Sequence, residues 1–474
     1  MKKTKSIVSL ILAAVMIFTA GISSSAASVW DIAWADTEEA SRGIIMQPGR
    51  DETERKFSWY MSEEITSCSV EIGTDYFMTN SEVYEGTVIS DRHGSNVAKV
   101  TVTGLEEGET YYYTCVSGTE KSDVYSFETI EGSSFSALYM SDIHITLDEE
   151  AGNTKTTAYE FADLLTEAKL RRGDINMILS AGDQATDGLK EEYEGLTFSS
   201  VSRSLTFATA IGNHDRKGIA YKYFTNLPNE DEGMISSPQG GNYYFVKGEV
   251  LFLVIDSNNA SATDHRNFIS NAVSANPDIK WRVVMMHHDL YGGTLENRES
   301  ENKLLRLILS PVFDEFNIDL VLTGHSHHYS ISNVLYNGKT VEKVEDGCTI
   351  NNAQGTVYMV SASVMRARED DDAVYSDRIA IGMKEFNEKL YNIIDFSEDS
   401  ITVTTYERGK AEEFASFTLT KDDEYKAPEI SFFRKLIGKI LGAFGTIYAV
   451  FNNIGRYSDL TEDGFNVDFF ETVF

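Results

Sequence analysis

The sequence predicts a multidomain protein in which a small all-β sandwich precedes an α/β domain, followed by an amphipathic helical extension. Residues 37–130 contain short alternating strands with a turn about every eight to twelve residues, which is typical of a β-sandwich. Five apolar, β-branched runs then alternate with helical stretches, which is typical of buried strands in an α/β layer. Residues 428–474 form the expected C-terminal extension, because apolar residues recur there at helical spacing.

Five polar clusters stand at the ends of the five apolar runs and hold seven of the nine histidines. The runs are 135–140, 175–179, 205–211, 281–286 and 318–322. The clusters are Asp142-Ile143-His144, Gly182-Asp183, Gly212-Asn213-His214-Asp215, His287-His288 and Gly324-His325-Ser326-His327-His328. Because the carboxyl ends of strands in an open α/β sheet meet at one crevice, we expect the clusters to form one polynuclear metal site.

The residue types in these clusters favour a particular kind of metal site. Imidazole and carboxylate groups bind divalent ions of intermediate softness, whereas a thiolate site needs cysteines. The chain has only Cys68, Cys115 and Cys348, far from the clusters, which excludes a zinc finger. A single His or Asp at a strand end is often only a hydrogen-bonded or capping residue. Five such clusters in order outweigh that explanation.

In this order the clusters resemble the calcineurin-like metallophosphoesterases, whose pattern is Asp-x-His, Gly-Asp, Gly-Asn-His-Asp/Glu, His and Gly-His-x-His. The resemblance covers residues 135–421 and implies an α/β/β/α sandwich that hydrolyses phosphoric esters with two divalent metal ions, Mn, Fe or Zn. It implies that the first metal is held by Asp142, His144, Asp183 and His327. It implies that the second is held by Asp183, Asn213, His287 and His325.

The resemblance also implies roles in catalysis. Asp183 would bridge two cations about 3.5–4 Å apart, and a hydroxide held between them would attack phosphorus without a protein nucleophile. His214 would be the general acid that protonates the leaving alkoxide. Asp215 would orient the His214 ring, or else cap a helix. His288, Tyr291 and His328 would bind substrate, although the two histidines could instead support ligand rings.

A second resemblance concerns the predicted sandwich. The stretch 100–113 resembles the fibronectin-III-like domain that precedes the catalytic domain of purple acid phosphatases. Those enzymes carry a tyrosine three residues after the bridging aspartate, where this chain has Thr186, and they lack a histidine at the position of His144. We therefore expect a colourless Mn²⁺, Fe²⁺ or Zn²⁺ pair rather than a purple ferric centre, which puts the name acid phosphatase in doubt.

The N-terminus and the overall charge predict the compartment and exclude some partners. Three lysines precede the apolar run 7–20, and small residues follow at 25–27, so residues 1–27 are expected to be a cleaved signal peptide of a secreted or cell-surface protein. A retained anchor is the alternative, but the run is shorter than the roughly 20 residues of a membrane span. The net charge of −33 argues against nucleic acid as a partner and leaves small phosphoesters as substrates.

Two further features leave alternatives open. Cys68 and Cys115 could form a disulfide after export or remain buried thiols. Residues 430–454 carry apolar residues at helical spacing together with Arg434, Lys435 and Lys439. This helix could dock on the protein's own catalytic domain or lie on a membrane surface.

The predicted function is hydrolysis of phosphomonoesters by an exported two-metal enzyme. A phosphodiesterase or nucleotidase with the same site is the alternative reaction. A non-catalytic surface-binding protein with a relic metal site is the alternative class. Every expected ligand and His214 are present, whereas a relic site would be free to lose them, so the sequence favours the enzyme.

Overall fold

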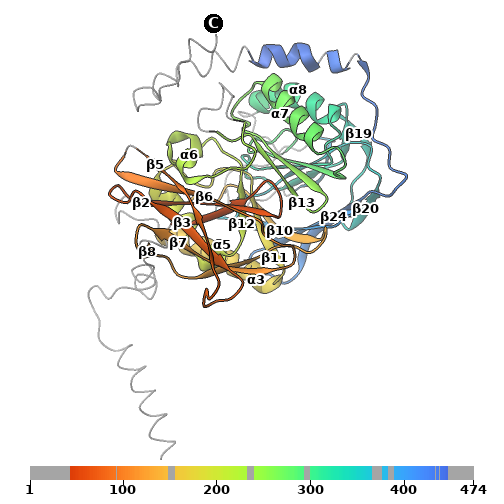
Figure 1. Ribbon diagram of the computed structural model, residues 1–474. Coiled ribbons are helices and arrows are strands. Elements are labelled where there is room, and N and C mark those ends of the chain that lie inside the picture. The colour runs from red at the N-terminus through yellow and green to blue at the C-terminus, as the bar shows by residue number, and fades with distance from the viewer. Residues whose placement is uncertain are drawn as a thin grey trace, which may run out of the picture. The chain divides into compact units, whose positions relative to one another are not determined.

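The computed structural model describes residues 43–91, 93–147, 155–231, 240–292, 299–365, 376–382, 389–432, 434–436 and 438–446. The expected signal peptide, residues 1–27, and residues 447–474 of the extension lie outside this part of the chain. Within it, a β-sandwich precedes a two-sheet α/β domain and a C-terminal helix (Figure 1). Among the described helices, none combines the length and apolar character that a membrane span requires.

The predicted β-sandwich is present as two antiparallel sheets. In the described residues, one sheet has the order β1-β2-β6-β5, and in the other β4-β3-β7-β8 is extended by β9 beside β7. The strands are β1 (Ile45–Pro48), β2 (Glu54–Ser62), β3 (Cys68–Gly73), β4 (Glu82–Glu85), β5 (Thr87–Ser90), β6 (Ser95–Thr103), β7 (Thr110–Ser117), β8 (Glu120–Lys121) and β9 (Tyr125–Glu128). Alternate residues of the longer strands face the core, where Phe57 and Tyr113 pack with ring centroids 4.8 Å apart. Cys68 and Cys115 lie on adjacent strands as buried free thiols.

The α/β domain contains two mixed sheets, each of seven strands in the described residues. The first has the order β12-β11-β10-β23-β24-β25-β20: β10 (Phe135–Met140), β11 (Ile175–Ser180), β12 (Thr206–Thr209), β20 (Cys348–Asn351), β23 (Leu390–Phe396), β24 (Ser400–Glu407) and β25 (Glu413–Thr420). The second has the order β13-β14-β15-β16-β21-β17-β22: β13 (Tyr243–Lys247), β14 (Val250–Val254), β15 (Trp281–Met285), β16 (Leu320–Thr323), β17 (Ser330–Ser332), β21 (Val357–Val360) and β22 (Ile379–Gly382). A separate hairpin is formed by β18 (Val334–Tyr336) and β19 (Lys339–Glu342).

Helices cover the outer face of each sheet, so the domain has the expected α/β/β/α layers. The helices that pack on the first sheet are α3 (Lys155–Arg171), α4 (Lys190–Leu196), α5 (Ser200–Arg203) and α6 (Ala220–Phe224). The helices that pack on the second sheet are α7 (Ala262–Ala275) and α8 (Glu299–Glu315). Helix α3 buries Ala158, Phe161, Leu164, Leu165 and Ala168, a spacing that places them on one helical face.

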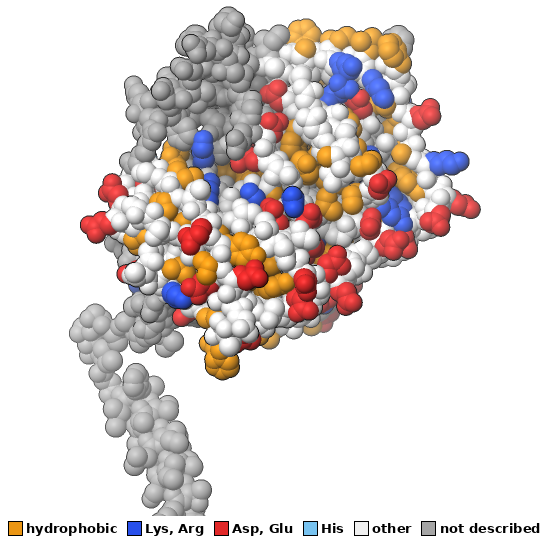
Figure 2. Space-filling view, in the orientation of Figure 1, with side chains coloured by type: hydrophobic (Ala, Val, Ile, Leu, Met, Phe, Trp, Pro, Cys, Tyr) orange, Lys and Arg blue, Asp and Glu red, His pale blue; other side chains and the backbone are white. Residues whose placement is uncertain are grey.

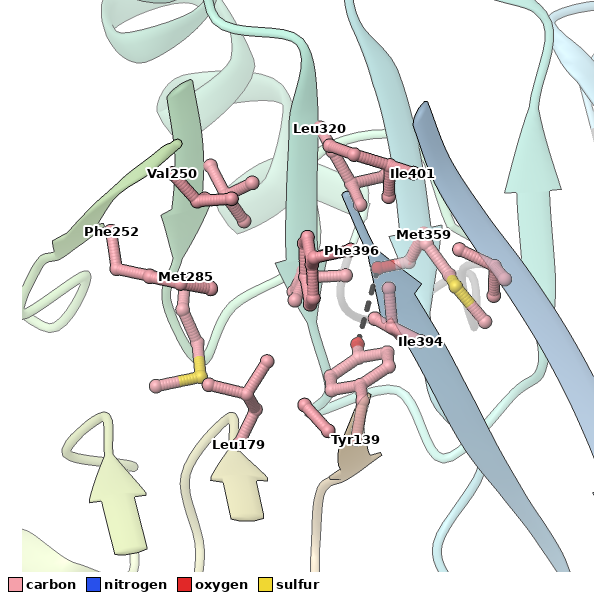
Figure 3. Close-up of a cluster of buried hydrophobic side chains, with 14 of the residues drawn as sticks. Tyr139, Leu179, Val250, Phe252, Met285, Leu320, Met359, Ile394, Phe396 and Ile401 are labelled. Atoms are coloured by element: carbon pink, nitrogen blue, oxygen red, sulfur yellow. Dashed lines mark hydrogen bonds between the residues drawn. The ribbon is translucent and has the colours of Figure 1, made fainter. Parts of the chain in front are cut away.

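The main core lies between the two sheets (Figure 3). Strand β10 is buried on both sides: Ala137 and Tyr139 face this core, whereas Leu138 and Met140 face the helices. The buried Tyr139 hydroxyl donates to the backbone carbonyls of Thr323 and Met359, which belong to β16 and β21 of the other sheet. This contact and the apolar packing fix the two sheets against each other.

The polar clusters gather at one edge because their strands run in the same direction. In the first sheet β10, β11 and β12 are parallel neighbours, and in the second sheet β14, β15, β16 and β21 are parallel neighbours. All five clusters follow the carboxyl ends of strands from these two sets. The two facing sheets therefore supply ligands from opposite sides.

The sandwich is joined to the α/β domain at residues 203–226, the segment that contains Asn213 and His214. The Tyr113 hydroxyl donates to the Arg203 carbonyl at 2.7 Å, and the Arg203 guanidinium carbon lies 4.9 Å from the centre of the Tyr125 ring. Lys99 and Asn226 extend this contact: the Lys99 ammonium donates to the Thr225 carbonyl at 2.7 Å, and the Asn226 amide donates to the Phe57 carbonyl at 3.0 Å.

The C-terminal helix comprises residues 432, 434–436 and 438–446 of the described chain. It lies along α7 and α8 (Figure 1). Arg434 forms an ion pair with the buried Asp314, and the Thr446 hydroxyl is 2.9 Å from the Ser261 hydroxyl. A side chain at Gly445 would meet the Ala260 carbonyl oxygen at 2.6 Å, so glycine permits this close approach. The helix therefore contacts the α/β domain, which is one of the two expected alternatives.

The buried Arg203 side chain provides a test of how the segment at residues 197–203 is held in place. Its guanidinium donates to the Thr197 carbonyl at 3.1 Å and the Phe198 carbonyl at 2.7 Å. Arg203→Ala leaves one buried and one partly buried carbonyl without their donor, so we expect the free energy of unfolding to fall by about 2–4 kcal/mol. Denaturant unfolding measures the change. The control is Lys121→Ala, whose exposed ion pair with Glu71 should contribute less than about 1 kcal/mol; equal effects of the two variants would contradict the prediction.

Candidate metal centre

The first expected ligand set comes together at the carboxyl ends of β10, β11 and β16. The Nε2 atom of His327 lies 3.0 Å from Asp142 Oδ1 and 3.3 Å from His144 Nε2. His144 Nε2 is also 3.7 Å from Asp183 Oδ2 and 3.8 Å from Asp142 Oδ1. The four ligand atoms predicted for the first metal thus form one compact group.

The second expected set shares Asp183 with the first. The Nε2 atom of His287 is 3.2 Å from Asp183 Oδ2, 3.1 Å from Asn213 Oδ1 and 3.2 Å from His325 Nδ1. The other ring nitrogen of His287, Nδ1, is 2.9 Å from the Ala181 carbonyl. That carbonyl accepts a hydrogen bond from Nδ1, which directs the Nε2 atom towards the centre of the group.

The spacing of these atoms fits two metal ions. A tetrahedral ion with ligands at about 2.0–2.2 Å separates neighbouring ligand atoms by about 3.4 Å. The separations in both sets, from 3.0 to 3.8 Å, scatter around that value. The donor atoms are imidazole nitrogens, carboxylate oxygens and one amide oxygen, which suit Mn²⁺, Fe²⁺ or Zn²⁺. The residues present therefore fit a dinuclear centre in which the Asp183 carboxylate touches both sites.

Backbone amides hold both carboxylates in position. The His325 amide donates to Asp142 Oδ2 at 2.9 Å, and the His214 amide donates to Asp183 Oδ1 at 2.8 Å. In each carboxylate the second oxygen is left facing the imidazoles. The Ser363 hydroxyl also donates to the Asp142 carbonyl at 2.7 Å. These hydrogen bonds fix the direction of the ligand atoms before any ion is present.

The backbone of the site is strained. Ten described residues other than glycine have a positive φ, and five of them are expected ligands. These five are Asp142, His144, Asp183, His325 and His327, with φ between 52° and 69°. Each such residue costs roughly 1–2 kcal/mol. Strain concentrated at one site indicates that ligand direction, rather than stability, determines the local backbone.

Close packing explains the glycine in the last cluster. A Cβ atom at Gly324 would lie 1.7 Å from Ser141 Oγ and 2.4 Å from Asp142 Oδ2. Only a residue without a side chain lets the β16 loop approach the β10 loop this closely. The glycine thereby brings His325 and His327 within reach of the carboxylates from the other sheet.

Burial and charge set the protonation of the ligands. Burial lowers the pKa of His144 to about 3, despite the carboxylates of Asp142 and Asp183, so the ring is neutral and has a free lone pair. Burial also opposes the charge of His287, but Asp183 and Asp142 raise its pKa to about 9. Burial disfavours the Asp142 anion, yet His327, His287 and His144 hold the pKa of Asp142 well below its usual value. A bound cation would take the place of the proton on His287.

His214 lies beside the first ligand set. Its ring packs edge-on against the His144 ring, with centroids 4.7 Å apart, and a ring nitrogen lies within 4.8 Å of the ligand atoms of His144 and Asp183. Its Nδ1 atom is 2.7 Å from the Thr186 carbonyl. His214 is half-buried, so it stands at the rim of the group rather than beneath it.

The structure corrects the expected role of Asp215. This carboxylate does not orient the His214 ring, because the Thr186 carbonyl does so. Nor does it cap a helix: it accepts hydrogen bonds from the Gly212 amide at 2.8 Å, the Ala185 amide at 3.1 Å and the Tyr193 hydroxyl at 2.8 Å. Burial and the charge of Asp183 raise the pKa of Asp215 to about 7. Asp215 therefore connects the loops after β11 and β12.

The structure also corrects the expectation for Tyr291. Its ring is buried in the core between the second sheet and its helices, 4.6 Å from the Tyr358 ring and 4.9 Å from the Arg306 guanidinium carbon. A side chain in that core cannot face substrate. The turn after β15 is held instead by Asp289, whose carboxylate accepts from the Gly292 amide and the Asn302 amide at 3.1 Å each.

His288 and His328 are also sealed from solvent, with exposed fractions of 3% and 0%. The His288 ring lies 4.3 Å from the His325 ring, and its Nδ1 atom is 2.9 Å from the Ser257 hydroxyl. His328 Nδ1 is 2.8 Å from the Ser326 carbonyl. This burial favours the alternative in which both rings support ligands rather than bind phosphate.

Sequence reasoning missed several residues that support the site. Tyr193 holds Asp215, Ser257 holds His288 and Ser363 holds the Asp142 backbone. Serine and tyrosine are frequent throughout the chain, and each of these residues lies more than 20 positions from its partner. No motif in the sequence distinguishes them. Ser257 follows the apolar strand β14, which was the one signal that could have pointed to it.

Comparisons with known proteins agree with this geometry. A family model described as calcineurin-like phosphoesterase matches residues 135–329, and one described as the purple acid phosphatase N-terminal domain matches residues 41–129. An uncharacterised protein of Mycobacterium tuberculosis H37Rv is 28% identical over 180 residues, which span 32% of this chain and 34% of that protein. Purple acid phosphatase 1 of Ipomoea batatas is 25% identical over 157 residues, or 31% of each chain. The match thus spans about a third of these relatives.

Solved structures share the fold. The purple acid phosphatase PPD1 from yellow lupin seeds superposes with a TM-score of 0.68 at 14% identity, over 82% of this chain and 77% of that chain. PhoD superposes with a TM-score of 0.54 at 11% identity, over 87% of this chain and 99% of that chain. The two family models match in the expected order, and the fold and the arrangement of the expected ligands agree with them. Residues 135–329 form a domain of the calcineurin-like phosphoesterase family, and residues 41–129 before it form a domain of the purple acid phosphatase N-terminal type.

Proposed function

We propose that the protein is an exported enzyme that hydrolyses phosphomonoesters at a dinuclear centre of Mn²⁺, Fe²⁺ or Zn²⁺. The observation that carries the proposal is the shared carboxylate oxygen. Asp183 Oδ2 lies 3.7 Å from His144 Nε2 in one ligand set and 3.2 Å from His287 Nε2 in the other. One side chain at the junction of two ligand sets can hold two cations close enough to stabilise both the attacking and the leaving oxygen of an in-line displacement at phosphorus.

The carboxylates, the imidazoles and the backbone amides around Asp183 have different roles in the proposed reaction. When bound, two cations supply an activated water and neutralise the charge of the phosphoryl group. Asp142 and Asp183 provide the negative charge that holds cations, and the buried imidazoles provide neutral donors. Amide hydrogen bonds from His325 and His214 keep the two carboxylates from turning away. The protein thus contributes position and charge rather than a nucleophile.

We propose that His214 gives a proton to the leaving oxygen. Its Nδ1 atom is held by the Thr186 carbonyl at 2.7 Å, so its Nε2 atom is the nitrogen available to substrate. The ring is half-buried beside His144 and belongs to a residue adjacent to the ligand Asn213. A positioned acid of this kind accelerates hydrolysis by about 10²–10⁴-fold.

The proposed metals follow from the residue at position 186. The Thr186 hydroxyl is 2.8 Å from the Thr146 hydroxyl, where a purple enzyme has a phenolate on ferric iron. His144 fills the first ligand set instead. Without the phenolate, the donor set is neutral imidazole and carboxylate, which favours divalent ions.

Reloading the metal-stripped protein tests the activity. We expect Mn²⁺, Fe²⁺ or Zn²⁺ to restore hydrolysis of nitrophenyl phosphate more effectively than Ca²⁺, with slower hydrolysis of the bis(nitrophenyl) diester. Asp183→Asn should bind neither ion tightly and lose on the order of 10³-fold or more in turnover. Metal content is measured alongside the rates.

A matched control for this variant is Asp163→Asn, because Asp163 is an exposed carboxylate on α3 that pairs only with Arg408 among the described residues. It should keep both metals and full activity. An Asp183→Asn protein that is active with two bound metals would contradict the bridging role. A faster diester reaction would identify a diesterase instead.

The role of His214 can be separated from binding by varying the leaving group. His214→Ala should lower kcat by about 10²–10⁴-fold with little change in KM or metal content. The loss should be larger for an alkyl phosphate than for nitrophenyl phosphate, because nitrophenolate departs without protonation. His93→Ala, an exposed histidine of the sandwich, is the control and should change nothing. Equal losses on both substrates with weaker inhibition by phosphate would show that His214 positions phosphate.

Export can be tested on the producing cells. The lysine-rich start, the apolar run 7–20 and the small residues at 25–27 predict cleavage after Ala27. N-terminal sequencing of the protein found outside the cytoplasm should therefore begin at Ser28. Protein that remains inside the cell with an intact N-terminus would contradict export.

A further inference from the structure

The C-terminal helix has two faces with different surroundings. One face contacts the catalytic domain through Arg434, Gly438, Gly442, Gly445 and Thr446. The opposite face carries Phe432, Leu436, Ile440 and Phe444, each four positions after the last. These four side chains are 77%, 41%, 50% and 66% exposed. We call these four side chains the apolar stripe.

The stripe is not an ordinary consequence of helix packing. An amphipathic helix normally turns its large apolar side chains towards the core and its small or charged ones to solvent. Here the glycines face the protein and the four large side chains of the stripe face outwards, although burying them would be favourable. Figure 2 shows hydrophobic side chains gathered along the edge over this helix, with Lys and Arg side chains beside them. The arrangement indicates that another apolar phase covers the stripe.

The charges around the stripe indicate that the apolar phase covering it is a lipid membrane. Lys435 and Lys439 are exposed, and helical geometry places both along one border of the stripe. Between residues 430 and 456 the chain has no Asp or Glu, although its net charge is −33. Arg434 does not add to the positive charge of the outward face, because it forms an ion pair with Asp314. The outward face is therefore apolar with a basic border, which complements anionic headgroups above acyl chains.

The size of the stripe argues against a second copy of the chain. A helix of residues 432–446 is about 22 Å long and about 10 Å wide, which gives on the order of 200–300 Å² per partner. A stable protein interface buries about 800 Å² per partner. The lysines of two antiparallel copies would also repel each other. A lipid surface has no such minimum, since insertion of a few large side chains and contact with anionic headgroups suffice for reversible binding.

We infer that the C-terminal helix binds the enzyme to a membrane surface with anionic lipids, with the apolar stripe inserted at the headgroup boundary and the two lysines at the phosphates. The ion pair between Arg434 and Asp314 and the close approach at Gly445 fix the helix to the catalytic domain. The domain would therefore be held on the surface directly rather than by a loose tether. The acidic surface elsewhere is screened beyond about one Debye length, roughly 8–10 Å.

Vesicle sedimentation tests this inference on the chain from residue 28 onwards, which omits the apolar run 7–20. We expect the protein to sediment with vesicles of phosphatidylglycerol and phosphatidylcholine, and less as salt increases. A variant with Phe432→Ser, Leu436→Ser, Ile440→Ser and Phe444→Ser should lose binding by at least roughly tenfold. Lys435→Gln with Lys439→Gln should lower binding to anionic vesicles and leave binding to phosphatidylcholine vesicles unchanged.

The control variant removes apolar side chains that are equally exposed elsewhere. Phe77, Leu170 and Val341 are 85%, 83% and 48% exposed, and changing all three to Ser should leave vesicle binding intact. Melting temperatures confirm that each variant folds. Unchanged binding by the stripe variant, or no binding by the parent chain, would overturn the inference. A dimer that the stripe variant dissociates would assign the stripe to a second copy, and binding that appears only after removal of residues 447–474 would assign it to that segment; either result overturns the inference.

Discussion

The site depends on holding carboxylates and imidazoles from two different sheets within 3–4 Å of one another. Asp142 and Asp183 follow strands of the first sheet, whereas His287, His325 and His327 follow strands of the second. Their closeness therefore requires the two sheets to be fixed against each other. The core between the sheets provides this, with Tyr139 reaching across it to the carbonyls of β16 and β21. A shift of one sheet by an ångström would disperse both ligand sets.

The same crowding makes the unloaded site unfavourable. Two buried carboxylates repel each other, they raise the pKa of His287 against the effect of its burial, and five of the expected ligand residues have strained backbones. Cations bound here would relieve the repulsion and satisfy the lone pairs, which would link metal binding to folding stability. The hydrogen bonds that hold Asp142 and Asp183 are the part of the site that exists without metal.

The sequence predicted the layers and the ligand clusters because both leave local signals. Apolar runs mark buried strands, and Asp142, Asp183 and His325 follow such runs directly, so their meeting required only that parallel strands end at one edge. The directions of the side chains could not be predicted in the same way. Asp215 adjoins His214 in sequence yet contacts Gly212, Ala185 and Tyr193, and Tyr291 turns into the core. Those directions depend on residues distant in the chain, which leave no local pattern.

The contacts between the sandwich and residues 203–226 also limit how far one domain can change without the other. That segment belongs to the α/β domain and contains Asn213 and His214, yet Tyr113, Lys99 and the Phe57 backbone contact it from the other domain. A recombination point placed in the linker near residue 130 would separate the segment from the surface that shapes it. A functional exchange of N-terminal domains would therefore have to bring matching contacts for Arg203 and Asn226, so the two domains behave as one structural unit.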